Sequence, residues 1–452
     1  MKFKNYEKVI FYILILFVSF ILVFNIFNYD PIQGYDAEAH HEYINNFFSM
    51  FIPGKSDSLT SSFTREYFSP PLPYFVPATI GAICRDILTS SVDFDRCKEI
   101  YSLFGQVFQT FLYIFSIYFY LLSFKKLYKN KITTNFEILL LFSLLTVNYK
   151  TISMIRGEAY IIFFLSIFLY KLLNMFEVSF DYTKLDILFF GLLIGGLALS
   201  RQWAFLLFPG LYIAGIFVSN KPQYFKFMSY SFIIGFIFSS WFYFDLYIQY
   251  GTFTSFNADQ LPFSFSNQPK SFYLPDIQSI NLVFTKPIRP NFSNQFLPIL
   301  YSDLWGDYWG YFSFTSRSLD TGRNQLLIGD YLARVNTVSV FLLFFFLYSI
   351  VSFVFDFIKK KSDSKDGFSF YIFISIIFSL LGYLWFLIKY PELKTGDTIK
   401  ATYLIQMFHL IVFISAQQLI KIKNLNPKLY KFITSTFIFI FFHNLSAMLS
   451  HF

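Results

Sequence analysis

The sequence predicts an all-α polytopic membrane protein with about 11 transmembrane helices. Of its 452 residues, 55% are hydrophobic and 14% are charged, and the mean hydropathy is +0.50. Soluble domains carry about 25% charged residues, so this composition excludes an ordinary soluble domain. The apolar residues lie in runs of about 20 residues, the length that a helix needs to cross the hydrocarbon core.

The first apolar run extends from Val9 to Phe27. Because no small-residue cleavage site follows it, we expect a retained helix and not a removed signal peptide. No internal repeat of fixed period is visible, so we treat 1–452 as one membrane domain. The further predicted spans are 103–124, 134–150, 157–174, 185–200, 202–219, 227–248, 337–358, 368–388, 401–420 and 432–449.

Lysines predict the orientation of these spans. They gather in alternate connections, at 2–8, 125–131, 171–184, 221–226, 359–365 and 421–431. The positive-inside rule places such segments in the cytoplasm, which predicts a cytoplasmic N-terminus and an outer C-terminus. The net charge of +8 is thus spread over membrane loops. It indicates no nucleic-acid partner, because such a partner requires a basic patch on a soluble surface.

Two long loops, 28–102 and 249–336, then lie on the non-cytoplasmic side. Arginine is confined to this side, where its planar fork of donors would suit phosphate or carboxylate. Ordinary ion pairs within the loops would use the same residues, and this alternative stays open. The arginines are Arg65, Arg85, Arg96, Arg156, Arg201, Arg289, Arg317, Arg323 and Arg334.

An acidic cluster directly follows the first span. It contains Asp36 and Glu38, with His40 and His41 close behind and Tyr35 in front. A carboxylate in a cavity of low dielectric can accept a proton from a hydroxyl or an amine. On a helix, Asp36 and His40 would face the same way. Capping and solvation of the helix end would explain the acids, but not this density of titratable groups.

The two cysteines of the chain, Cys84 and Cys97, both lie in the first outer loop. In an oxidising compartment they could close a small loop, so we predict a disulfide between them. Two unpaired thiols are the alternative. Before them, prolines at 70, 71 and 73 precede a short apolar run at 75–83, which is typical of a helix lying in the membrane interface.

Three cations lie at predicted outer ends of spans: Arg156, Arg201 and Lys400. Such residues could reach lipid headgroups. They could equally bind a phosphate that approaches from the bilayer.

The second outer loop contains an aromatic and acidic segment with Trp305, Asp307 and Trp309. Aromatic faces flanked by carboxylates suit sugar rings, so we predict substrate contacts here. An interfacial aromatic belt has the same composition, and that alternative stays open.

Together these segments resemble the GT-C superfamily of membrane glycosyltransferases. This superfamily includes protein O-mannosyltransferases, lipid A aminoarabinose transferases and dolichol-pathway glucosyl- and mannosyltransferases. The matching features are Asp36-x-Glu38 with His40 after the first span, Pro70-Pro71-Leu72 in the first outer loop, Arg156-x-Glu158 at the head of a span, and a basic residue before Tyr403.

The resemblance implies transfer of a sugar from a polyprenyl-phosphate donor to a glycan, lipid or protein acceptor on the non-cytoplasmic face. It implies that Asp36 is the general base, that Glu38 assists, and that Arg156, Arg201 and Lys400 hold the donor phosphate. Many members have adjacent acids where this chain has Asp-Ala-Glu, with one residue between the two acids. No cofactor is expected with certainty, and a divalent metal stays open.

The resemblance also implies an integral protein of the plasma membrane in a bacterium, or of the endoplasmic reticulum in a eukaryote. The substrate contacts would come from Tyr35, His40, His41, Arg65, Trp305, Asp307 and Trp309. A flippase of lipid-linked glycan is a rival, but it needs polar groups at mid-depth in the spans, and the sequence indicates no clear acidic or basic residue there. An O-antigen polymerase or ligase is a second rival, because the loop at 249–336 is long.

Overall fold

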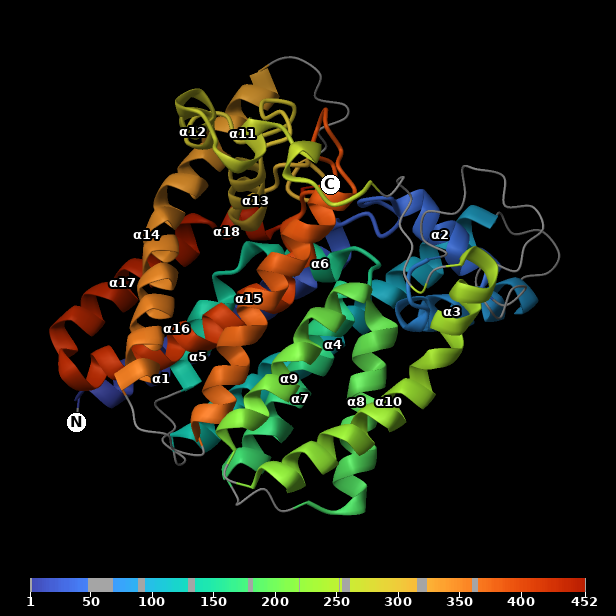
Figure 1. Cartoon of the computed structure of the whole chain (residues 1–452). Helices are drawn as coiled ribbons and strands as arrows, with labels where there is room; N and C mark the ends of the chain where they lie inside the picture. Colours follow the sequence, from blue (N-terminus) through green and yellow to red (C-terminus); the bar gives the residue numbers. More distant parts are fainter. Residues whose placement is uncertain are drawn as a thin grey trace.

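The structure is a computed structural model of the whole chain, and its described residues form helices joined by loops (Figure 1). It describes residues 2–47, 68–87, 94–128, 135–177, 182–218, 220–251, 253, 261–314, 323–359 and 365–451. Arg65 and Arg317 lie outside these ranges, so the structure places neither of them.

The helices of the first half, in chain order, are α1 (Lys2–Asn28), α2 (Ala37–Asn46), α3 (Leu72–Ile87), α4 (Phe94–Leu127), α5 (Asn135–Ser143), α6 (Thr146–Ser153), α7 (Glu158–Glu177), α8 (Lys184–Ser200), η2 (Gln202–Leu207), α9 (Phe208–Ala214), η3 (Gly215–Phe217) and α10 (Lys221–Tyr250). Those of the second half are η4 (Phe265–Asn267), α11 (Lys270–Tyr273), α12 (Ile277–Val283), α13 (Phe296–Trp305), α14 (Arg323–Lys359), α15 (Lys365–Lys389), η5 (Ala401–Leu404), α16 (Ile405–Leu425), α17 (Pro427–His443) and α18 (Leu445–Met448).

Among the described residues, seven helices are long and apolar enough to cross a membrane, or eight if α5 and α6 form one bent span. These two helices meet at 66°. Every span predicted from the sequence falls on helix, but several fall on short or broken helices, which is why the predicted number is larger. The chain is therefore an integral membrane protein by composition and helix length, while the number of crossings and their direction stay predictions.

The centre of the bundle is α16, whose residues are almost all buried. It packs against α5, α7, α14, α15 and α17. At the periphery, α8 and α10 approach so closely that a Cβ on Gly191 would lie 2.6 Å from Cβ of Ile234. Glycine at this position lets the two backbones meet, as small residues do between membrane helices.

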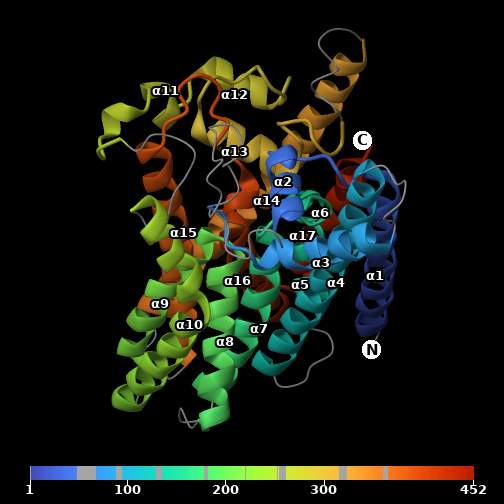
Figure 2. The same ribbon diagram turned by 90° about the vertical axis from the view of Figure 1, so that its right-hand side faces the viewer.

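Both views place α2 and α11–α13 at the end of the bundle that lies away from the N-terminus (Figures 1 and 2). The C-terminus also lies at this end. The two termini therefore sit on opposite sides of the bundle, which a cytoplasmic N-terminus and an outer C-terminus would require.

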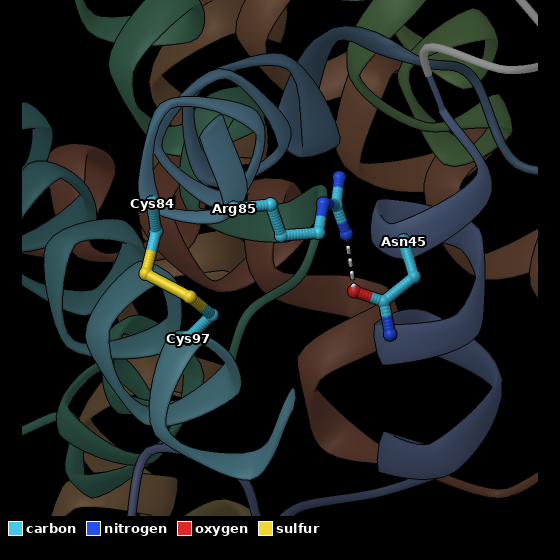
Figure 3. Close-up of a disulfide and its surroundings, with 4 residues drawn as sticks. All are labelled: Asn45, Cys84, Arg85 and Cys97. Atoms are coloured by element: carbon cyan, nitrogen blue, oxygen red, sulfur yellow. Dashed lines mark hydrogen bonds between the residues drawn. A yellow bond between two sulfur atoms is a disulfide. The ribbon is translucent and has the colours of Figure 1, made fainter. Parts of the chain in front are cut away.

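Cys84 on α3 and Cys97 on α4 form a disulfide, with their Cα atoms 5.8 Å apart (Figure 3). Next to it, Nη1 of Arg85 donates a hydrogen bond to Oδ1 of Asn45 on α2, at 3.2 Å. The pair is the one that the sequence predicts. Together the two contacts join α2, α3 and α4 into one unit beside the bundle.

Candidate functional site

The candidate site lies where four elements begin or end. Asp36 precedes α2, Arg156 precedes α7, Arg201 separates α8 from η2, and Lys400 precedes η5. Arg201 and Lys400 both have extended backbones, with φ of −165° and −131°. At each of these positions the helix has ended or has not yet begun, and the four side chains come together there.

Asp36 has a positive φ, with φ 54° and ψ 27°, and no other non-glycine residue in the described part of the chain has one. Asp and Asn tolerate this left-handed conformation better than most residues. Its Oδ2 lies 3.2 Å from Nζ of Lys400. The Lys400 charge lowers the pKa of Asp36 well below its usual range, with His40 and Arg156 adding to it against the opposing effect of burial. Asp36 is therefore an ionised carboxylate in an ion pair.

Glu158 is shared by two arginines. Its Oε2 lies 3.0 Å from Nε of Arg156, and its Oε1 lies 3.4 Å from Nε of Arg201. One carboxylate thus faces two guanidinium groups, which leaves one positive charge unmatched within this triad. Within the part of the chain that the structure describes, Nη2 of Arg156 is buried and has no hydrogen-bond partner. A buried donor of this kind is costly unless a ligand satisfies it.

Two tyrosine rings hold these cations together. Nζ of Lys400 lies 4.8 Å from the ring centroid of Tyr35, and Cζ of Arg156 lies 5.2 Å from the same centroid. The Tyr403 ring receives the same two cations at 5.6 and 5.7 Å. These distances are in the range of cation–π attraction. Lys400 and Arg156 thus contact the same two aromatic rings. Arg201 is linked to Arg156 through the Glu158 carboxylate.

Asp303 on α13 connects three further parts of the site. It forms a buried salt bridge with Lys150 on α6, and its Oδ1 accepts a hydrogen bond from the Tyr35 hydroxyl at 3.2 Å. Its Oδ2 accepts one from the backbone N–H of Ala401 at 2.7 Å. The carboxylate therefore positions Tyr35 beside Asp36 and the backbone that follows Lys400.

Lys150 and Asp303 are functional candidates that sequence analysis missed. Lys150 ends the predicted span 134–150, and Asp303 stands in the aromatic segment without any assigned role. The available signal was a charged residue at the end of an apolar run for Lys150, and within the short apolar segment 296–305 for Asp303. A charge in such a place in a membrane chain indicates function.

In the structure, Trp305, Asp307 and Trp309 are buried in the protein. Both indole rings are buried, with 0% and 2% of their surface exposed, so neither offers a face to a sugar. Nε1 of Trp309 donates to the Ile399 carbonyl at 3.0 Å. Asp307 accepts backbone N–H groups of Phe312 and Ser313 at 2.8 and 2.9 Å. The predicted sugar contacts therefore do not agree with the burial of these residues, and we leave them out of the proposed site.

His40 and His41 are also buried. Nδ1 of His40 lies 2.7 Å from the Tyr74 hydroxyl on α3, and Nδ1 of His41 lies 3.2 Å from the Tyr101 hydroxyl on α4. They hold α2 against its neighbours, whatever they add to substrate binding. Glu38 is exposed on the first turn of α2, and its predicted role stays a prediction.

One further titratable side chain corrects the sequence analysis. His409 lies within α16, where we expected no basic residue, and it is fully buried. Its two nitrogens contact the Tyr120 hydroxyl at 3.2 Å and Oδ1 of Asn148 at 2.9 Å. Satisfied on both sides, it serves as a polar link between α4, α6 and α16.

Among the described residues, no group of three or more His, Cys, Asp or Glu side chains could hold a metal ion.

Comparison with known proteins gives little. No family model matches the chain, and no curated protein matches it. Among solved structures, it is similar to ArnT from Cupriavidus metallidurans bound to undecaprenyl phosphate, at 11% identity and a TM-score of 0.40, over 91% of this chain and 79% of that one. A likeness of this size carries no argument about function, so the argument rests on the residues of this chain.

Proposed function

We propose that this protein is a membrane glycosyltransferase that moves a sugar from a polyprenyl-phosphate carrier to an acceptor on the non-cytoplasmic face. The observation that carries the proposal is the position of Asp36. A carboxylate in reach of solvent lies directly beside Lys400, and Lys400 shares its aromatic surround with Arg156. A base therefore stands next to a site for an anion.

The transfer assigns a task to each side of the site. The Asp36 carboxylate takes the proton of the acceptor hydroxyl or amine, and the acceptor atom forms a bond to the anomeric carbon. The bond between that carbon and the phosphate oxygen breaks, and polyprenyl phosphate leaves with the electron pair. Arg156, Arg201 and Lys400 stabilise the charge that develops on the phosphate.

The cations are suited to this role by their environment. Arg156 and Arg201 are nearly buried, so their attraction for an anion is stronger than it would be in water. The Arg156 Nη2 donor, which has no partner among the described residues, is one group that a phosphate oxygen would satisfy. A phosphate in a buried site needs more than one cation, and this site supplies Arg156, Arg201 and Lys400.

The test is Asp36→Asn in purified protein reconstituted in lipid. Asn tolerates the same left-handed backbone, so the change removes basicity and charge and keeps the shape. We expect transfer to fall about 10²- to 10⁴-fold, with unchanged expression and membrane insertion. Wild-type turnover by this variant would exclude Asp36 as the base.

A whole-cell comparison separates this function from that of a flippase. If the protein is a transferase, deletion of its gene should make a polyprenyl-phosphate monosaccharide accumulate. A flippase predicts instead that a complete lipid-linked oligosaccharide accumulates on the inner leaflet.

A further inference from the structure

We propose that Asp36 and the donor phosphate compete for Lys400, so that donor binding itself releases the Asp36 carboxylate to act as the base. This inference rests on the proposed function and adds a regulatory step to it. The site without donor is then in a resting state, and the Lys400–Asp36 ion pair is the contact that must open.

Exposure identifies this pair as the one that can open. Three acids pair with the cations of the site: Asp36, Glu158 and Asp303. The Glu158 and Asp303 side chains are 0% exposed, whereas that of Asp36 is 31% exposed. A freed Asp36 carboxylate would be solvated, while either of the other two would become an unpaired buried charge, which is strongly unfavourable.

The position of Lys400 favours exchange with a phosphate. Lys400 and Arg156 contact the same two rings, Tyr35 and Tyr403. A phosphate could therefore contact both cations at once, while the Asp36 carboxylate forms its ion pair with Lys400. It would also reach Nη2 of Arg156, which has no partner among the described residues. The phosphate thus gains contacts that the carboxylate lacks.

Release of Asp36 has a chemical consequence. The groups that face this carboxylate are Lys400 before η5, His40 on α2 and Arg156 before α7, and Lys400 has the largest effect on its pKa. When the negative phosphate neutralises Lys400, the pKa of Asp36 rises toward its ordinary value. A carboxylate in the Lys400 ion pair is a weak base, and the freed carboxylate is a stronger one. Basicity therefore appears only when a donor is present.

The experiment measures binding and needs no turnover. Undecaprenyl phosphate is titrated into the protein in phosphatidylcholine nanodiscs, with undecaprenol as the probe that lacks phosphate. Asp36→Asn removes the competitor, so we expect it to bind undecaprenyl phosphate about tenfold tighter than wild type, at the low end of usual coupling because Asp36 is partly exposed. Undecaprenol binding should not change.

Two further variants make this result specific. Glu42→Gln removes one negative charge from α2, the helix that follows Asp36, and we expect less than about a twofold change from it, because Glu42 is partly exposed and the effect of such a charge is screened by solvent. In a Lys400→Gln background, the tenfold gain from Asp36→Asn should disappear, because the two groups no longer compete. Circular dichroism and size-exclusion chromatography verify that each variant is folded.

Unchanged or weaker binding by Asp36→Asn would overturn the competition, as would an equal gain in Glu42→Gln or persistence of the gain without Lys400. These outcomes are independent of the proposed function. Loss of transfer with unchanged affinity leaves Asp36 as a base and refutes the exchange. Tighter binding with normal transfer supports the exchange and refutes the base.

Discussion

At the scale of single residues, Asp303 shows how one carboxylate can position a site without contacting the reaction. Lys150, Tyr35 and the backbone after Lys400 all depend on it. Asp303→Asn should leave Lys150 as an unpaired buried charge and lower the free energy of unfolding by about 3–5 kcal/mol. Thermal unfolding in detergent measures this.

A double variant separates charge from packing at this position. Lys150→Met added to Asp303→Asn removes the unpaired charge and should recover much of the lost stability. Transfer should remain low in the double variant, because Tyr35 and Ala401 have still lost their anchor. If the double variant were as unstable as Asp303→Asn alone, the effect would not come from the Lys150 charge.

His41, which packs α2 against α4, should make the stability of the folded protein depend on pH. Burial, with Lys98 and His40 adding to it, lowers the pKa of His41 to about 3. An unfolded histidine titrates near 6.5. Above that pH both states are neutral, and as pH falls through it the unfolded state alone binds the proton, so stability declines. Between pH 7 and pH 5 we expect a loss of about 2 kcal/mol.

The measurement is the unfolding temperature across this pH range. His41→Gln should remove most of the decline, whereas His451→Gln, at an exposed histidine near the C-terminus, should not. An equal decline in wild type and His41→Gln would show that another group is responsible.

At the scale of elements, the start of α7 and the end of α8 are packed backbone to backbone. A Cβ on Gly157 would lie 2.2 Å from the Ser200 carbonyl oxygen. Gly157→Ala should therefore push apart the segments that carry Arg156 and Arg201, cost about 1–3 kcal/mol and reduce transfer. On α14, a Cβ on Gly329 would meet its nearest neighbour at 3.7 Å, so Gly329→Ala is the matched control. Equal behaviour of the two variants in stability and transfer assays would contradict the close approach.

The disulfide fastens α3 to α4 and so supports the unit that carries α2. Cys84 and Cys97 are 13 positions apart, and a loop of this size is stabilised by about 3 kcal/mol in the chain-entropy model. Alkylation of unreduced protein from an oxidising compartment should leave both cysteines unmodified in mass spectrometry. Two alkylated thiols would refute the bond.

At the scale of the whole molecule, the separation of the termini agrees with the predicted orientation but does not assign the sides of the membrane (Figures 1 and 2). Lys394→Cys, in an exposed loop near the site, should react with an impermeant maleimide in intact cells. Lys428→Cys, at the exposed start of α17, should react only after permeabilisation. The reverse pattern would invert the topology and move the site to the cytoplasmic face. The unsubstituted protein is the control for labelling.

Much of the bundle could be predicted because long apolar runs have few alternatives in a bilayer, where every backbone group must be bonded internally. The bend between α5 and α6 could not, since no proline or glycine marks Leu144 and Leu145. At the site, Asp36 and the cations were visible as charges at predicted ends of spans. The Lys150–Asp303 pair was not, because its partners are separated by 153 positions and only packing brings them together.

The sequence by itself determined the class of fold, the acidic segment after the first helix, and the cysteine pair. These are local properties, set by the length and polarity of contiguous residues. Only the tertiary structure decided which charges pair, that two arginines share Glu158, and that Trp305 and Trp309 lie in the core. The physical reason is that a residue type limits what a side chain can bind, while the partner and the exposure depend on how distant helices pack around it.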